Sequence, residues 1–127
     1  MSAAPGPPTK ERSIVARFEP AHNRSLFETL VAQMGAVEPE TRVGAMFGCP
    51  AAFVGRRMVF CVYGEGVGVR LPHVDAARLI AFRQATAFRP FGRPPMKEWV
   101  ELRVEPGDVL RIAPILALAL RYAREQA

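Results

Sequence analysis

Few residues in this chain have the types and spacing that metal binding requires. The imidazoles are those of His22 and His73, and the thiols are those of Cys49 and Cys61. A structural zinc site needs four converging ligands, usually supplied by closely spaced pairs, and neither the histidines nor the cysteines form such a pair. We therefore expect no metal and no cofactor.

One arrangement with nucleophilic chemistry stays open. Cys49 lies in the segment Gly48-Cys49-Pro50, which we expect to be an exposed kink, and a reactive thiol needs an oriented base beside it. His73 follows a strand of the same predicted meander. A small-ligand or enzymatic pocket around Cys49, His73 and Arg93 is therefore the alternative function. We favour a chain that is not an enzyme, because its carboxylates form no catalytic pair.

Glu98 has the only carboxylate that falls on the apolar register of a predicted strand. A buried carboxylate needs a charged or hydrogen-bonding partner. We expect a structural ion pair with Arg93 or with an arginine of the meander. The glycines at 64, 66 and 68 are not a phosphate-binding loop, because they follow a hairpin and open a strand rather than a helix.

Basic residues are concentrated in the middle of the chain. The net charge is +5 and the isoelectric point is about 10.0. Such an excess of basic residues is typical of a surface that binds nucleic acid or an acidic protein. The alternative is that the arginine side chains only cover the rim of the sheet with their apolar stems. Trp99, beside Lys97, is the aromatic residue that could stack a base or anchor a protein, unless the arm or a helix covers it. The residues predicted to bind a partner are Arg56, Arg57, Arg70, Arg93, Lys97 and Trp99.

The elements that must position these residues follow from periodicity and turn residues. An apolar stripe predicts a helix that begins at Pro20, Asn23 or Ser25 and stops at Gly35. Residues 43–47 and 51–54 are expected to form one strand, interrupted by the kink at 48–50. Turns at Gly55-Arg56 and Gly64-Glu65 then lead into strands over 58–63 and 67–71, and such short turns make the strands antiparallel.

The second half of the chain repeats this alternation of helix and strand. His73 or Asp75 is expected to cap a second helix, whose apolar side is Val74, Ala77, Leu79, Ile80 and Phe82. Residues 96–104 alternate between two faces of a half-buried strand. A last helix is expected from Ala113 to about Glu125 after one loose turn. It is apolar nearly all round, so we expect it to be buried against the sheet and the first helix, or against a second copy of the chain.

The order of several short motifs resembles the N-terminal domain of the TfoX/Sxy family, as a stand-alone small protein. These motifs are Met46-Phe47-Gly48, Pro50-Ala51-Ala52-Phe53-Val54, Met58, Val69-Arg70-Leu71-Pro72, Phe88-x-Pro90, Gly92-Arg93-Pro94 with Met96-Lys97-Glu98, and Leu120-x-Tyr122-Ala123. The resemblance covers residues 25–123. Pro95 and Trp99 depart from the usual pattern, in which Met follows Gly-Arg-Pro directly and Tyr follows Glu, so the role of the turn at 92–95 is open.

The resemblance implies an α+β domain with an antiparallel sheet flanked by helices, and no cofactor. Named members are linked to the regulation of competence, but they carry a second, helical domain, so we do not expect that role to transfer whole. The chain of 127 residues is predicted to be a flexible arm (1–12) followed by one domain (13–127). With no signal peptide or membrane-spanning run, it is expected to be cytoplasmic, as a monomer or as a homodimer through its last helix. Its predicted function is regulatory: it would bind a protein or nucleic-acid partner.

Overall fold

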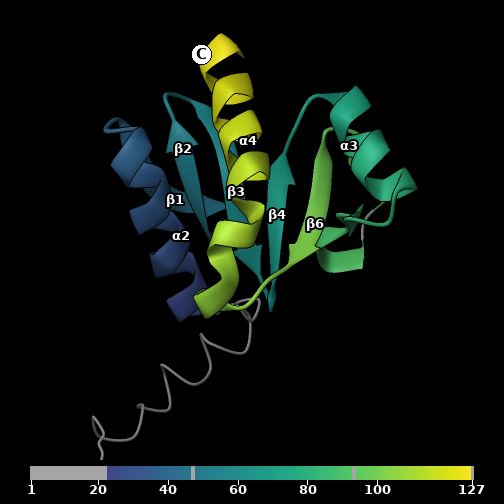
Figure 1. Cartoon of the computed structure of the whole chain (residues 1–127), viewed down its shortest axis with the longest axis horizontal. Helices are drawn as coiled ribbons and strands as arrows, with labels where there is room; N and C mark the ends of the chain where they lie inside the picture. The colour runs from purple at the N-terminus through teal and green to yellow at the C-terminus, as the bar shows by residue number, and fades with distance from the viewer. Residues whose placement is uncertain (1–22, 47, 93, 127) are drawn as a thin grey trace, which may run out of the picture.

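Six antiparallel strands form one sheet in the order β1-β2-β3-β4-β6-β5, with α2 and α4 packed on one face (Figure 1). The computed structural model describes residues 23–126 except 47 and 93. This arrangement confirms the predicted α+β class. The elements are α2 (Arg24–Val37), β1 (Thr41–Met46), β2 (Cys49–Val54), β3 (Arg57–Tyr63), β4 (Gly66–Arg70), α3 (His73–Ala81), β5 (Thr86–Ala87), the 3-10 turn η1 (Pro90–Gly92), β6 (Trp99–Arg103), the 3-10 segment η2 (Pro106–Ile112) and α4 (Ala113–Gln126).

Helix α2 begins at one of the predicted caps but continues past the predicted stop. The Asn23 side chain accepts a hydrogen bond from the Leu26 N–H at 3.0 Å, which satisfies one of the free donors of the first turn. The stop at Gly35 is wrong, because the helix runs to Val37 and the Glu38 N–H still donates to the Met34 carbonyl at 2.8 Å. Burial of Met34 favours this last turn more than one glycine disfavours it.

The predicted interrupted strand is instead a hairpin, and this changes the position of Cys49. Met46 pairs with Cys49 and Thr41 with Val54, so β1 and β2 are separate antiparallel strands. The chain reverses beside Gly48, which has a φ of 81° that favours glycine. Cys49 is therefore a buried strand residue and not part of an exposed kink.

The two other predicted turns are confirmed. Val54 pairs with Arg57 across the first turn, and Tyr63 pairs with Gly66 across the second. Gly55 and Gly64 have φ values of 60° and 61°. These left-handed conformations explain why glycine opens each turn.

Helix α3 is present, but its cap and its buried side differ from the prediction. The N-cap is Pro72, and His73 lies inside the first turn without capping it. Ala76 is the buried residue of α3, whereas Val74 and the following Phe82 are 66% and 71% exposed. The reason is the location of α3 at the end of the sheet beside β5 and β6, where little sheet surface remains to cover it (Figure 1).

Strand β6 is shorter than the predicted 96–104, because residues 97–98 form a turn in which the Trp99 N–H donates to the Met96 carbonyl, but its predicted alternation is present, and α4 begins where predicted. Val100 and Leu102 enter the helix-side core, while Trp99 lies on the opposite face. Helix α4 follows the 3-10 segment η2, which is the expected loose turn, and it packs on β3 between β2 and β4. Its buried residues are Leu116, Ala119, Leu120 and Ala123.

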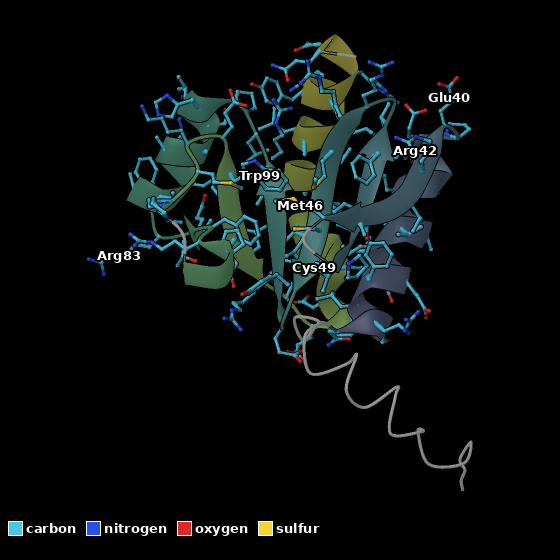
Figure 2. All side chains as sticks on the ribbon, turned by 180° about the vertical axis from the view of Figure 1, so that it is seen from behind. Glu40, Arg42, Met46, Cys49, Arg83 and Trp99 are labelled. Atoms are coloured by element: carbon cyan, nitrogen blue, oxygen red, sulfur yellow. The ribbon has the colours of Figure 1, made fainter. Side chains whose placement is uncertain are left out.

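The back face of the sheet, opposite α2 and α4, carries a second and smaller apolar cluster. Phe88 is 1% exposed, and its ring lies over Gly68 and tilts against Trp99 at 5.6 Å between centroids. Ala51 and Cys61 complete the buried part of this cluster. Figure 2 shows this face, with Trp99 labelled on its β6 side. Trp99 is thus buried, but the ring that packs against it is Phe88, from the segment after β5, and not a side chain of a helix.

Candidate partner-binding end of the sheet

Antiparallel topology brings several of the predicted binding residues to one end of the sheet. Arg56 and Arg57 lie at the β2–β3 turn, Arg70 ends β4, and Lys97 and Trp99 lie at the start of β6. Arg70 and Trp99 are direct partners across the β4–β6 pair. We call this region the basic end. Arg93 lies outside the described residues, so its place is not assigned.

The last turns of α4 also lie at the basic end. The Arg57 Nε donates to the Gln126 carbonyl at 3.1 Å, and the Arg70 guanidinium lies 4.7 Å from the centre of the Tyr122 ring. These contacts add Arg121 and Arg124 to the same end. Sequence reasoning did not include them in the site, because only the packing of α4 on β3 shows where its C-terminus lies.

Arg70 has a structural role within the basic end. Its Nη2 donates to Glu98 Oε1 at 2.9 Å, and the Tyr122 hydroxyl donates to Glu98 Oε2 at 2.9 Å. Only 14% of the Arg70 side chain is exposed. The expected ion pair between Glu98 and an arginine of the meander is therefore confirmed. This cluster ties β4, β6 and α4 together, so Arg70 is less available to a partner than its neighbours are.

Besides Arg42, whose guanidinium donates to the Gly55 carbonyl, the exposed basic residues of this end without an ion pair among the described residues include Arg56, Arg57, Lys97 and Arg121. The partly or fully buried carboxylates there, Glu38, Asp75 and Glu98, are already paired, Asp75 with Arg78. Glu98 pairs with Arg70, and Glu38 accepts from Arg124 Nε at 2.6 Å. Two exposed carboxylates, Glu40 and Glu125, remain. The four side chains thus form an accessible cationic surface that can attract an anionic partner.

The alternative pocket is not assembled by the residues that the structure describes. Cys49 is buried on β2, and His73 is exposed at the start of α3. The principal cavities are lined by neither residue. Burial raises the pKa of the Cys49 thiol, which disfavours the nucleophilic thiolate.

Cys61 is a core thiol. Burial, reinforced by the neighbouring Cys49, raises its pKa to about 12. A thiol with so high a pKa is protonated at neutral pH, and only the thiolate is a good nucleophile. Within the described part of the chain, no group of three or more His, Cys, Asp or Glu residues is arranged to hold a metal ion.

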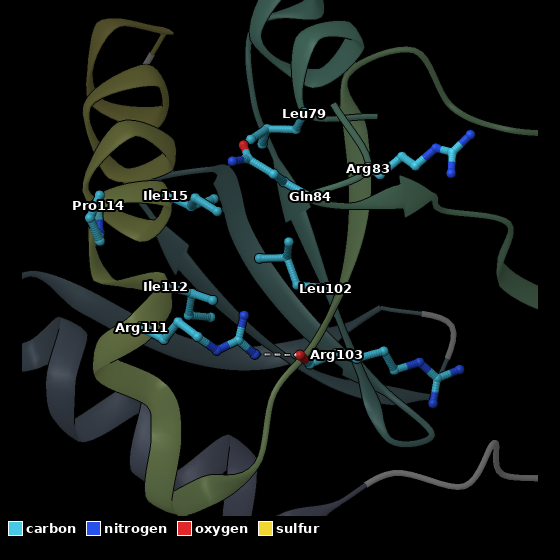
Figure 3. Close-up of a pocket in the computed structure, with 9 residues that line it drawn as sticks. All are labelled: Leu79, Arg83, Gln84, Leu102, Arg103, Arg111, Ile112, Pro114 and Ile115. Atoms are coloured by element: carbon cyan, nitrogen blue, oxygen red, sulfur yellow. Dashed lines mark hydrogen bonds between the residues drawn. The ribbon is translucent and has the colours of Figure 1, made fainter. Parts of the chain in front are cut away.

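A groove of about 490 Å³ lies between α3 and α4 (Figure 3). Leu79, Leu102, Ile112 and Ile115 line its interior, and Arg111 lies at its mouth. Arg111 donates to Asp108 Oδ2 and to the Arg103 carbonyl, both at 2.8 Å, so its donors are already engaged. The apolar wall of the groove therefore has no free charge from Arg111, although the exposed Arg83 also lines the groove.

No protein-family model, curated protein or solved structure matches this chain. The resemblance to the TfoX/Sxy family thus stays a prediction. Among the described residues, no helix is long and apolar enough to span a membrane. Any proposal about function must therefore stand on the geometry of the molecule itself.

Proposed function

We propose that this chain is a non-enzymatic regulatory or adaptor domain, which docks on a negatively charged macromolecule through its basic end. The supporting observation is the convergence of Arg56, Arg57, Lys97 and Arg121 on one end of the sheet, without ion pairs among the described residues. The more buried carboxylates Glu98 and Glu38 are occupied by Arg70 and Arg124, and only the exposed Glu40 and Glu125 offset part of the charge of the four basic side chains. The positive charge at this end is therefore free to act on an external partner.

The shape of this end suits docking better than enclosure of a small ligand. Arg56 and Arg57 line an open hollow that also includes Gly55 and Gln126, the last residue of α4. The Arg57 side chain donates a hydrogen bond to the Gln126 carbonyl, and this bond attaches the β2–β3 turn to the end of α4. Exposed arginines on a rigid hairpin can pair with phosphates or with the carboxylates of an acidic protein.

The proposal is tested by binding measurements on the full chain. Fluorescence anisotropy at low salt would be recorded with labelled duplex DNA, labelled single-stranded DNA and labelled poly-glutamate. We expect binding to at least one of these probes, with an affinity that falls as salt is added. Preference for DNA would identify a nucleic-acid partner, and preference for poly-glutamate would identify an acidic protein. The absence of salt-sensitive binding to all three would refute the proposal.

Matched variants locate the contact. The double change of Arg56→Ala and Arg57→Ala removes two unpaired charges and is expected to weaken binding; with DNA, the slope of log affinity against log salt should fall by about 2. Arg24→Ala is the control, because Arg24 is also exposed but lies at the opposite end of the sheet, beside the β3–β4 turn that Asn23 contacts. The control removes one charge and the test variant two, so equal weakening per removed charge would show that binding is non-specific and would contradict the assigned surface.

A further inference from the structure

The outer edge of β1 is an unusually accessible strand edge. Among residues 23–126, the part that the structure describes, β1 is the terminal strand of the sheet and pairs only with β2. Four consecutive residues, 42–45, are exposed, and Val43 is 59% exposed. The N–H and C=O groups on the outer side of such a strand are available to another strand. In contrast, the opposite edge of the sheet is β5, which has only two residues.

β1 carries little of what usually protects a strand edge. It contains no proline and no lysine, and its pairing with β2 is regular over all six residues. Its one charged residue, Arg42, turns inward: its guanidinium donates to the Gly55 carbonyl and lies 5.3 Å from the centre of the Phe53 ring. Figure 2 shows β1 at the margin of the sheet, with Glu40 and Arg42 near its first residue. Charge therefore does not block the edge.

The faces of β1 restrict how a second strand can be added. Val43 pairs with Ala52 of the helix-side core, so Val43 points to the helix side. Arg42 and Gly44 pair with Phe53 and Ala51, which belong to the back face. Directly opposite residues of neighbouring strands point to the same face of a sheet. A partner strand must therefore place an apolar side chain opposite Val43 and a small residue opposite Arg42.

We propose that β1 pairs with β1 of a second copy of this chain, antiparallel, about a two-fold axis through Val43. In this register Val43 lies opposite Val43 of the second copy, and Arg42 lies opposite Gly44. The sequence of β1 thus meets both restrictions by itself. No like charges are opposed, and the exposed Val43 side chains are buried against each other. The two sheets become one, with the helices of both copies on the same side.

The antiparallel axis also determines where the basic ends lie. Each copy has its basic end at the beginning of β1, where Thr41 pairs with Val54 just before the β2–β3 turn. Because the two β1 strands run in opposite directions, the two basic ends lie at opposite ends of the joined sheet. The assembly would present two separate cationic surfaces. The pairing itself does not depend on the function of those surfaces.

Sedimentation velocity of the full chain, from micromolar to millimolar protein, tests the proposal. One strand pair buries less than the roughly 1,200 Å² of a standard stable complex, so the association should be weak and concentration-dependent. We expect the mass to rise from 14.0 kDa towards twice this value. A mass that stays at 14.0 kDa at millimolar concentration would overturn the proposal.

Two variants test the position of the axis. Val43→Lys and Val43→Glu each place like charges opposite each other and should weaken self-association by about tenfold or more. An equimolar mixture of the two should regain association, because Lys then faces Glu. Failure of the mixture to associate, with both variants folded by circular dichroism, would overturn the register.

Control variants separate this edge from other surfaces. Val74→Lys makes the same chemical change at a valine that is 66% exposed on α3, and it should leave association unchanged. Ala117→Arg alters the exposed side of α4, through which a homodimer is the competing prediction. Loss of association with Ala117→Arg, but not with Val43→Lys, would assign the dimer to α4 and overturn the proposal.

Discussion

Gly68→Ala tests how tightly Phe88 closes the back face of the sheet. A Cβ added at Gly68 would lie 2.8 Å from Phe88 Cζ and 3.1 Å from Cys61 Sγ. Normal contacts between carbon atoms are about 3.5–4.0 Å, so the ring must move. It has little room, because its centroid is 5.6 Å from that of Trp99 and 6.1 Å from that of Tyr63.

The expected magnitude is a balance of two effects. Overpacking of a core by one methyl group costs about 1–3 kcal/mol. The loss of glycine reduces the entropy of the unfolded chain, which offsets about 0.4–1 kcal/mol. The two ranges leave a net cost of about 0–2.6 kcal/mol; because Trp99 and Tyr63 confine the Phe88 ring, we expect Gly68→Ala to lower the free energy of unfolding by about 1–2 kcal/mol. For a domain of this size, that corresponds to a fall in Tm of roughly 3–12 °C.

Gly35→Ala is the matched control, and its effect should have the opposite sign. Gly35 lies inside α2 with no atom within 4 Å of an added Cβ, so alanine should stabilise the helix by about 0.5–1 kcal/mol. Urea denaturation of both variants gives the two values. In a Phe88→Leu background, Gly68→Ala should cost less, since the smaller side chain leaves space for the methyl group. A neutral Gly68→Ala, or an equal cost in both backgrounds, would refute the packing argument.

Three further predictions concern single side chains. Arg83 follows α3 with a φ of 60°, so Arg83→Gly should raise the free energy of unfolding by about 0.5–1 kcal/mol in urea, and a loss of stability would contradict this. Hydrogen bonds from the backbone N–H of Glu40 and, to a smaller extent, from Arg124 lower the pKa of Glu38 below 4.5. The free energy of unfolding should therefore fall as the pH drops through this lowered pKa. Glu38→Gln removes the titrating group and should make acid unfolding less steep. Burial raises the pKa of Cys61 from 9.0 to about 12, so this thiol should react with iodoacetamide only after unfolding. The free energy of unfolding should fall as the pH rises above 9, because only the thiol of the unfolded chain ionises there. Rapid labelling of the native chain would show that Cys61 is not buried.

Local signals in the sequence predicted most of the elements. Asn23 is one of the predicted starts of α2, glycine predicts the turns at 55 and 64, and the alternation of residues 96–104 predicts β6. Each of these depends on neighbours within a few positions, which is the range of caps, turns and side-chain periodicity. The need of Glu98 for an arginine was also visible, because a carboxylate on an apolar register requires a partner.

Other features of the protein depend on contacts between residues that are distant in the sequence, and only the tertiary structure shows them. The reversal beside Gly48 turned one expected strand into a hairpin, which buried Cys49 and created the free edge of β1. Likewise, Arg70, Glu98 and Tyr122 meet only because β4, β6 and α4 end together. The sequence shows which residues are charged or apolar, but their position on an edge, on an end or in a core is decided by which strands pair and where each helix packs. Pairing and packing are set by the summed burial of the whole domain, which no short segment encodes.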